Sequence, residues 1–468
     1  MRLRHAALAV GLGCIAVLGA GGMACGEEKR VVDQLLDILR ENNQINEQQY
    51  RELKRRALEE RREDLRQAET PPPAPPPVAA APAAPAPESM RAYFKNGFVL
   101  ESADKSFSVT IGGRLQADWN ASYPGDAVQD AFDIDSPQSG AEFRRARLSI
   151  AGLVFGNVDY KIEYDFATGD AEAKDVFLGV RKIPYVQYVR VGHFKEPFSL
   201  EEVGSDSFTT FMERGLPNAF SPSRNMGIGI LQEYLEQRMT VAGGGFAEVD
   251  NTGFGFGHDE GYNLTARITG LPIYEEQGRH LLHLGLSYSH KLRHHRDITF
   301  SQRPESHLFP VTLVNTGAID TDGVDLINPE LAWVLGPLSL QAEYMHAFVS
   351  QAGNPNPQFG GFYVNASYFL TDGDMRAYRV AEGAFDRIIP KRTFSLDGRG
   401  WGAWEVAARF SRVDLGSENV EGGTEDDVTG GINWYLNPVT RVTVNYVWAH
   451  LESVGDSNIA QGRFQVSF

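Results

Sequence analysis

The stretch Val158-Asp159-Tyr160-Lys161-Ile162-Glu163-Tyr164-Asp165-Phe166 decides the fold, because its side chains alternate between apolar or aromatic and charged. A β-strand turns successive side chains to opposite faces, so one face of this segment is apolar and the other carries only charge. A soluble β-sandwich can contain one strand of this kind. Repetition of the pattern along the chain is therefore what distinguishes a soluble sheet from a membrane barrel.

The two-residue period returns in segment after segment from residue 106 onward. Each segment has about the length that crosses a bilayer at the tilt of a barrel strand. Charges lie on one face only, as a water-filled interior requires, and tyrosine and tryptophan gather near the segment ends, where aromatic girdles lie. Further examples are 107–119, 282–289, 338–344, 362–368, 404–411 and 441–448.

The connections predict the type and size of the barrel. We count 16 strands in residues 106–468, with 18 as the alternative, because 297–320 holds one strand or two. The predicted fold class is all-β, an antiparallel transmembrane β-barrel with short turns at one end, long loops at the other and an aqueous channel. Short turns are expected at 156–157, 183–184, 236–237, 336–337 and 437–438, and long polar loops at 120–140, 250–260, 372–399 and 415–424.

The composition excludes several other classes of protein. The 468 residues are 42% hydrophobic, and no apolar run after residue 30 approaches the length of a membrane-spanning helix. The formal net charge of −17 does not suggest a nucleic-acid-binding protein. We find no nucleophile elbow, phosphate-binding glycine loop or zinc signature, so we predict no enzyme activity, no cofactor and no metal site.

Both ends of the chain carry features typical of exported outer-membrane proteins. Residues 1–24 have a basic start, an apolar stretch at 6–20 and the small residues Gly22 and Ala24 before the expected cleavage point. Cys25 is either the lipidated first residue of the mature chain or unmodified, since the preceding residues match the lipid-attachment pattern poorly. The last residue, Phe468, resembles the terminal signal of outer-membrane barrels.

The residues between the leader and the barrel are helical in pattern. Val32, Leu35, Leu36 and Leu39 recur at helical spacing. Asn46, followed three residues later by Gln49, resembles a capping box that opens a second helix. The narrow apolar stripe favours a coiled coil, with a solvated single helix as the alternative. We predict four parts: signal peptide 1–24, charged helical segment 25–70 in the periplasm, Pro/Ala linker 71–89 and barrel 90–468.

Three stretches resemble the phosphate-selective porins O and P of Gram-negative bacteria: 143–148 (FRRARL), 191–201 (VGHFKEPFSLE) and 211–225 (FMERGLPNAFSPSRN). The resemblance implies a homotrimer of 16-stranded barrels in the outer membrane, in contact with lipid and lipopolysaccharide. It also implies that a loop near 198–225 folds into each pore, and that arginine and lysine select small anions, phosphate or polyphosphate among them. A general non-selective porin and a structural outer-membrane protein with a tethering helix remain the alternatives.

Alternate residues of a strand face the lumen, and we call this odd or even position the strand parity; it identifies the cations that face the lumen. Arg144 has lipid-facing parity, which it tolerates only near the aqueous rim or at a β-bulge. Arg190 is the weakest assignment, because its face also carries Val186 and Tyr188. The predicted pore-lining and anion-binding residues are Arg114, Arg144, Arg145, Arg147, Lys161, Arg190, Lys195, Arg214 and Arg224.

The same charges also have simpler interpretations. Lumen cations solvate the interior and pair across strands with carboxylates such as Asp159, Glu163 and Asp165. His294-His295 is interpreted as part of an exposed polar loop, since a metal site needs more ligands. The acidic run 126–135 is interpreted as a solvated loop, with a Ca²⁺ or Mg²⁺ bridge to lipopolysaccharide as the alternative.

Overall fold

The computed structural model describes residues 36, 38–42, 44–68, 90–255, 261–351, 353 and 355–468, without the side chains at 60, 61, 63–68 and 293–296. The chain divides into two units, Met1–Ala84 and Pro85–Phe468. The predicted signal peptide, Cys25 and the linker 71–89 lie outside the described residues. No helix among the described residues is long and apolar enough to cross a bilayer.

The first unit contains the helix α2 (Glu47–Ala68). Its start is capped as the sequence indicates, because the Gln49 amide N–H donates to Asn46 Oδ1 at 2.9 Å and the Asn46 N–H donates to Gln49 Oε1 at 3.0 Å. Tyr50 is buried, and the guanidinium of Arg40 lies 4.6 Å from its ring centre. The helical prediction is confirmed for α2, whereas the coiled coil stays a prediction.

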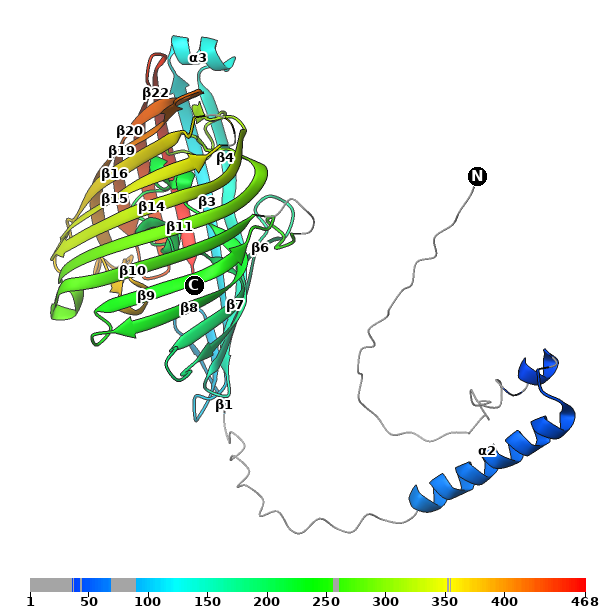
Figure 1. Ribbon diagram of the computed structural model, residues 1–468. Helices are drawn as coiled ribbons and strands as arrows, with labels where there is room; N and C mark the ends of the chain where they lie inside the picture. Colours follow the sequence, from blue (N-terminus) through cyan, green and yellow to red (C-terminus); the bar gives the residue numbers. More distant parts are fainter. Residues whose placement is uncertain are drawn as a thin grey trace. The chain divides into compact units, whose positions relative to one another are not determined.

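The second unit is a closed antiparallel barrel of 16 tilted strands (Figure 1). A hairpin of β1 (Met90–Phe94) and β2 (Phe98–Ser102) extends the sheet along the start of the first barrel strand. The barrel strands are β3 (Ser108–Pro124), β4 (Gln138–Val154), β5 (Val158–Asp165), β6 (Glu172–Arg181), β7 (Tyr188–Lys195), β8 (Arg224–Tyr234), β9 (Met239–Ala247), β10 (Tyr262–Glu275), β11 (His280–Ile298), β14 (Ile319–Leu335), β15 (Leu338–Ser350), β16 (Gln358–Phe369), β19 (Ala403–Ser417), β20 (Val420–Tyr435), β21 (Thr440–Leu451) and β22 (Gly455–Ser467).

The barrel closes where β22 pairs with β3, from Ser457 opposite Pro124 to Ser467 opposite Arg114. Beyond that seam the terminal residue Phe468 exchanges two backbone hydrogen bonds with Gly113, at 2.8 and 2.9 Å. Closure leaves no barrel strand with an unpaired edge, which is the condition for a β-sheet to exist in lipid.

The two faces of β3 show why this sequence forms a membrane barrel. Ile111, Leu115 and Trp119 point outward and are exposed, Trp119 by 55%, whereas Gln116 is 0% exposed and Asn120 is also buried. A soluble protein buries the first set and exposes the second. The inverted arrangement matches a lipid-facing wall around a polar lumen, and it confirms the alternation read from the sequence.

Short connections gather at one end of the barrel, which we call the turn end; the other is the loop end. The predicted short turns are confirmed there, and a further turn holds η2 (Glu276–Gly278). Two predicted loops are wrong in extent: β19 and β20 continue to a turn at 418–419, and the loop after β3 begins at 125 and contains α3 (Asp126–Phe132). His294-His295 is likewise strand backbone within β11 rather than loop.

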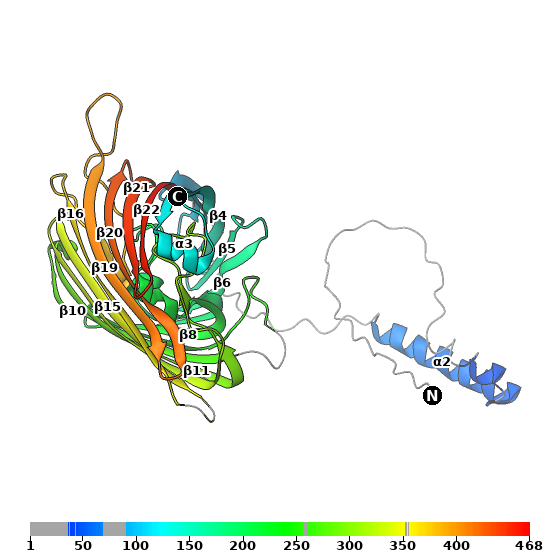
Figure 2. The ribbon, with the colours of Figure 1, turned by 90° about the horizontal axis from the view of Figure 1, so that it is seen from above.

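Three segments fold wholly or partly into the lumen of the barrel; Figure 2 views the barrel from above. Segment 196–223 enters from the loop end, as the resemblance implies, and contains α4 (Leu200–Val203) and η1 (Leu216–Phe220). Segment 299–318 enters from the same end with the short pair β12 (Ser301–Gln302) and β13 (Val314–Asn315), so the barrel has 16 strands rather than 18. Segment 370–402 enters from the turn end with β17 (Tyr378–Arg379), η3 (Val380–Glu382) and β18 (Ala384–Phe385).

The placement of segment 370–402 corrects the prediction that all long connections share one end. It leaves β16 beside the 336–337 turn, where the Phe369 N–H donates to the Pro337 carbonyl at 3.0 Å, and it returns into β19. Apolar side chains hold the infolded segments together: Phe220 and Phe300 meet edge to face, their ring centres 5.1 Å apart. The lumen thus has an apolar core of its own.

Candidate functional site

One carboxylate, that of Asp206 in segment 196–223, is the centre of a charge cluster inside the barrel. Five cationic side chains from β3, β4, β7 and the segment itself have a nitrogen within 4.0 Å of it, and we call this set the Asp206 cluster. The distances to the Asp206 oxygens are 3.1 Å from Arg145, 3.1 Å from Arg147, 3.2 Å from Arg114, 2.6 Å from Arg214 and 4.0 Å from Lys195.

The cluster is buried, so its charges act on one another with little screening by water. Asp206 is 5% exposed and Arg145 is also 5% exposed. Burial raises the pKa of the Asp206 carboxyl, but the positive charges of Arg145, Arg214 and the neighbouring cations lower it more, so that pKa lies well below its ordinary value. The surrounding cations therefore stabilise the ionised form of Asp206.

Arg144 reaches the lumen through a β-bulge. The pairing of β3 with β4 shifts between Gln116, which faces Arg145, and Ala117, which faces Phe143, so Arg144 has no partner in the ladder. The extra residue turns the Arg144 side chain inward, where its guanidinium donates to both carboxylate oxygens of Glu213 at 3.0 and 3.1 Å. The bulge is one of the two conditions under which parity allowed an arginine here.

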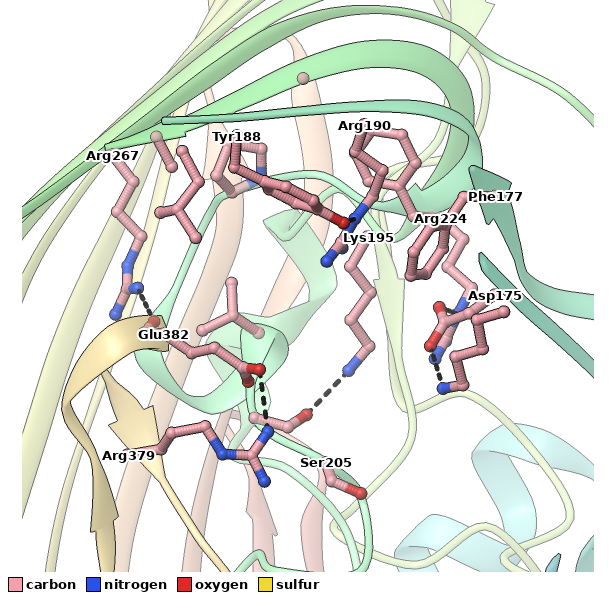
Figure 3. Close-up of a pocket in the computed structure, with 18 of the residues that line it drawn as sticks. Asp175, Phe177, Tyr188, Arg190, Lys195, Ser205, Arg224, Arg267, Arg379 and Glu382 are labelled. Carbon is pink, nitrogen blue, oxygen red and sulfur yellow. Dashed lines mark hydrogen bonds and ion pairs between the residues drawn. The ribbon is translucent and has the colours of Figure 1, made fainter. Parts of the chain in front are cut away.

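A cavity of about 400 Å³ lies beside the Asp206 cluster (Figure 3). Seven cationic and four acidic side chains line it, together with an aromatic wall of Phe177, Tyr188 and Phe194. The lining is basic although the whole chain carries a formal charge of −17. The cations are the predicted residues Arg114, Lys161, Arg190, Lys195 and Arg224, joined by Arg267 and Arg379.

Most of these cations are neutralised by a carboxylate. Asp175 binds both Lys161, at 2.6 Å, and Arg224, at 2.8 Å. Arg267 donates to Glu330, and Arg379 to Glu382 and Asp386. Within the described part of the chain, no set of three or more histidine, cysteine, aspartate or glutamate side chains is placed to hold a metal ion.

Arg190 differs from its neighbours in the cavity. Its Nε donates to the Tyr188 hydroxyl at 3.1 Å, and its guanidinium lies 4.1 Å from the ring centre of Phe177, as Figure 3 shows. Among the described residues no carboxylate pairs with it. A guanidinium held by aromatic rings keeps its charge and donors available to a solute.

A second cavity, of about 290 Å³, lies between segments 196–223 and 299–318. It is lined by Arg144, Glu213 and Arg214 and by the exposed Arg303. Arg214 forms its ion pair with Asp206, which lines the first cavity. The two cavities therefore meet at the Asp206 cluster.

Arginines of the wall and of segment 370–402 hold segment 196–223 by its main chain. Each donates to a backbone carbonyl oxygen of that segment from β19, β21, β22 or segment 370–402, a geometry that fixes the course of the segment across the lumen. The bonds run from Arg376 to Phe208 at 2.9 Å, Arg441 to Thr209 at 2.6 Å, Arg463 to Met212 at 2.6 Å and Arg409 to Glu213 at 2.9 Å.

The nine predicted residues thus fall in one region, and several of their partners were missed. Arg267 follows the inward parity of β10, with Thr265 and Thr269, so its strand carried a readable signal. Arg379 and Asp206 lie in infolded segments without periodicity, where parity makes no prediction. Their roles depend on long-range contacts that the sequence alone does not reveal.

A closed barrel with an apolar exterior, a charged interior and infolded segments between two cavities defines the class: this is an outer-membrane porin, a channel protein rather than an enzyme. The chain belongs to the family of phosphate-selective porins O and P, whose family model matches residues 109–468.

Two relatives are similar in sequence, and a solved structure is similar in fold. Porin O of Pseudomonas aeruginosa is 24% identical over 404 residues, covering 78% of this chain and 88% of the relative. An uncharacterized protein of Caulobacter vibrioides is 29% identical over 363 residues, covering 74% and 69%. A loop-deletion form of OmpT, an outer membrane protein of Vibrio cholerae, has a TM-score of 0.50 at 14% identity, covering 78% of this chain and 100% of the other, and shares the fold.

Proposed function

We propose that this porin is a passive diffusion channel that prefers small anions, phosphate and polyphosphate among them. The carrying observation is Arg190, a lumen guanidinium with no carboxylate partner among the described residues, in a cavity whose charged side chains are mostly cationic. An anion that sheds water in a narrow channel gains charge-assisted hydrogen bonds from such groups. The planar fork of arginine matches two phosphate oxygens at once.

The remaining predicted cations act with Arg190 in this proposal. Lys161 and Arg224 have Asp175 as a common ion-pair partner. Lys195 and Arg214 both pair with Glu202 and with Asp206. Each of these cations is therefore partly neutralised by a carboxylate. Several weak sites along a path conduct better than one deep trap, because a solute must leave as well as enter. The paired cations supply such weak sites on either side of segment 196–223.

A general, weakly selective porin is the second candidate, and the carboxylate pairing favours it. Of the seven cations in the larger cavity, Arg190 alone has no acidic partner among the described residues. A lumen neutralised to this degree discriminates less strongly than an array of free arginines. The two candidates predict the same sign of selectivity but different strengths.

Bilayer electrophysiology separates these candidates. The purified porin should give stepwise currents whose reversal potential in a KCl gradient has the sign of chloride preference, and phosphate and polyphosphate should reduce the chloride current. Chloride preference without a phosphate effect supports the general porin. Cation preference overturns the anion proposal, and absence of conductance from folded protein supports a structural, tethering role.

We further propose that three copies assemble in the outer membrane with the N-terminal helical segment in the periplasm. Membership of the porin family supports the trimer. The chain enters the barrel through β1 and β2 at the turn end, and the short turns of outer-membrane barrels face the periplasm, which supports the place of the helical segment. Chemical cross-linking of the full chain in outer membranes should yield a band at three times the monomer mass, and protease added from the periplasmic side should remove α2. A monomeric band, or digestion of α2 from outside intact cells, would contradict it.

A further inference from the structure

The Asp206 carboxylate sits where a bound oxyanion would be expected. Three guanidinium groups from the wall, those of Arg114, Arg145 and Arg147, approach one of its oxygens within 3.2 Å, and Arg214 approaches the other at 2.6 Å. Convergence of several guanidinium groups on one small anion is the arrangement by which proteins bind phosphate. Here the chain supplies the anion itself.

Two of these cations depend on Asp206 alone for their ion pairing. Arg147 also binds Asp165, and Arg214 also binds Glu202. Arg114 and Arg145, by contrast, have no other acidic partner among the described side chains. The Nε of Arg114 is also buried without a hydrogen-bond acceptor. The cluster therefore has unused donor capacity next to the Asp206 carboxylate.

Hydrogen bonds to Ser205 and to the Asp206 main chain hold the carboxylate in this position. The Asp206 carbonyl oxygen accepts from Gln116 Nε2 at 3.5 Å and from the Thr209 hydroxyl at 3.3 Å, and Arg114 also donates to the neighbouring Ser205 hydroxyl at 2.8 Å. Asp206 lines the larger cavity directly. A permeating anion in that cavity thus meets a cluster in which the Asp206 carboxylate already occupies one anion-binding position.

We propose that Asp206 is a tethered counter-ion that sets the anion affinity of this pore. A passing oxyanion shares the guanidinium groups with the fixed carboxylate, and its own charge is repelled by it. Both effects weaken binding, and they weaken it most for multiply charged phosphate and polyphosphate. The inference rests on the proposed anion-preferring function. It adds the residue that limits how tightly the pore binds its anion.

The test replaces the carboxylate by an amide of the same shape. In planar bilayers, Asp206→Asn should lower the phosphate concentration that halves the chloride current by about tenfold or more, because a like charge within ~4 Å of the bound anion is removed. Asp206→Glu, which keeps the charge, should change that concentration much less than Asp206→Asn does. Asp397→Asn is the matched control, since that exposed aspartate lies outside both cavities.

A second pair of variants keeps the test decisive if removal of one buried charge prevents folding. Arg145→Gln and the double variant Asp206→Asn/Arg145→Gln are compared with each other, because the double variant has the wild-type net charge in the cluster. Phosphate should block the double variant at a lower concentration than Arg145→Gln alone. Equal or weaker block, in this pair or in Asp206→Asn against the wild type, overturns the inference.

The wild-type measurement distinguishes failure of the inference from failure of the proposed function. A wild-type pore that prefers cations refutes the anion function, and with it the inference. An anion-preferring wild type whose phosphate block is unchanged by Asp206→Asn leaves the function standing and removes Asp206 from control of affinity.

Discussion

Arg463 donates to both carboxylate oxygens of Asp118, at 2.7 and 2.6 Å, and so ties the last strand of the barrel to the first. The two residues are directly opposite each other in the pairing of β22 with β3, and both are buried. The same guanidinium also reaches Glu213 and the Met212 carbonyl oxygen of segment 196–223. The closing seam and the infolded segment are thus stabilised by one side chain.

Replacement of Arg463 by alanine should destabilise the barrel. Removing one partner of a buried ion pair leaves the other charged without compensation, at a cost of about 3–5 kcal/mol. Urea unfolding in lipid vesicles, followed by tryptophan fluorescence, should show a lower midpoint. Arg412→Ala removes a half-exposed pair with Asp426 and should cost less than ~1 kcal/mol; equal effects of the two variants would show that the seam pair has no special weight.

Arg190→Gln should shift the reversal potential toward zero, because it removes the cavity cation that no carboxylate neutralises among the described residues. We expect the anion-to-cation permeability ratio to fall by about twofold to fivefold, as for a charge in partly screened surroundings. Arg399→Gln is the matched control, because its side chain is 87% exposed and lies outside both cavities. An unchanged ratio in Arg190→Gln would exclude this arginine from selection.

Arg441→Gln should loosen segment 196–223. The substitution removes the donor at 2.6 Å from the Thr209 carbonyl oxygen, and leaving a buried carbonyl unpaired costs about 1–3 kcal/mol. Open-channel current noise should increase, and the segment should become sensitive to limited proteolysis from the loop end. Current as quiet as that of the wild type would mean that the remaining wall arginines suffice to hold the segment.

The two cavities should be accessible from opposite ends. The predicted barrel region, 90–468, contains no cysteine, so single cysteines can be introduced without background there. A bulky membrane-impermeant thiol reagent should modify Glu382→Cys from the turn end, because Glu382 lies in segment 370–402 and lines the larger cavity. Arg303→Cys, in the smaller cavity, should react from the loop end. Reaction of both from the same side would contradict the assignment of segment 370–402.

Much of the wall could be predicted from the sequence, because alternation is a local property of each strand. Parity placed Arg114, Arg145 and Arg147 in the lumen, and their contacts with Asp206 agree. Parity alone gave the wrong face for Arg144. A β-bulge shifts the register there by one residue, and the direction of the side chain depends on how β4 pairs with β3. The candidate site was therefore predictable to the extent that its residues lie on regular strands.

The errors have a common physical origin. Residues 415–424 have loop-like composition, yet strands β19 and β20 continue through most of them, because a strand that extends past the lipid faces water and can be polar on both faces. Segment 299–318 left open whether the barrel has extra strands. Its apolar residues Phe300 and Phe309 pack within the lumen instead of against lipid. Composition does not reveal whether an apolar side chain meets lipid or an infolded loop.

The arginines that reach segment 196–223 from the wall and from segment 370–402 bind carbonyl oxygens, and every amino acid supplies a carbonyl oxygen. These four bonds are available whatever side chains stand at 208, 209, 212 and 213, and the Glu213 carboxylate adds ion pairs with Arg144 and Arg463. Cavity-lining side chains elsewhere in the segment, such as Val203 and Asn218, can therefore be substituted while these four bonds remain in place. Evolution and protein engineering can thus retune permeability on an unchanged frame.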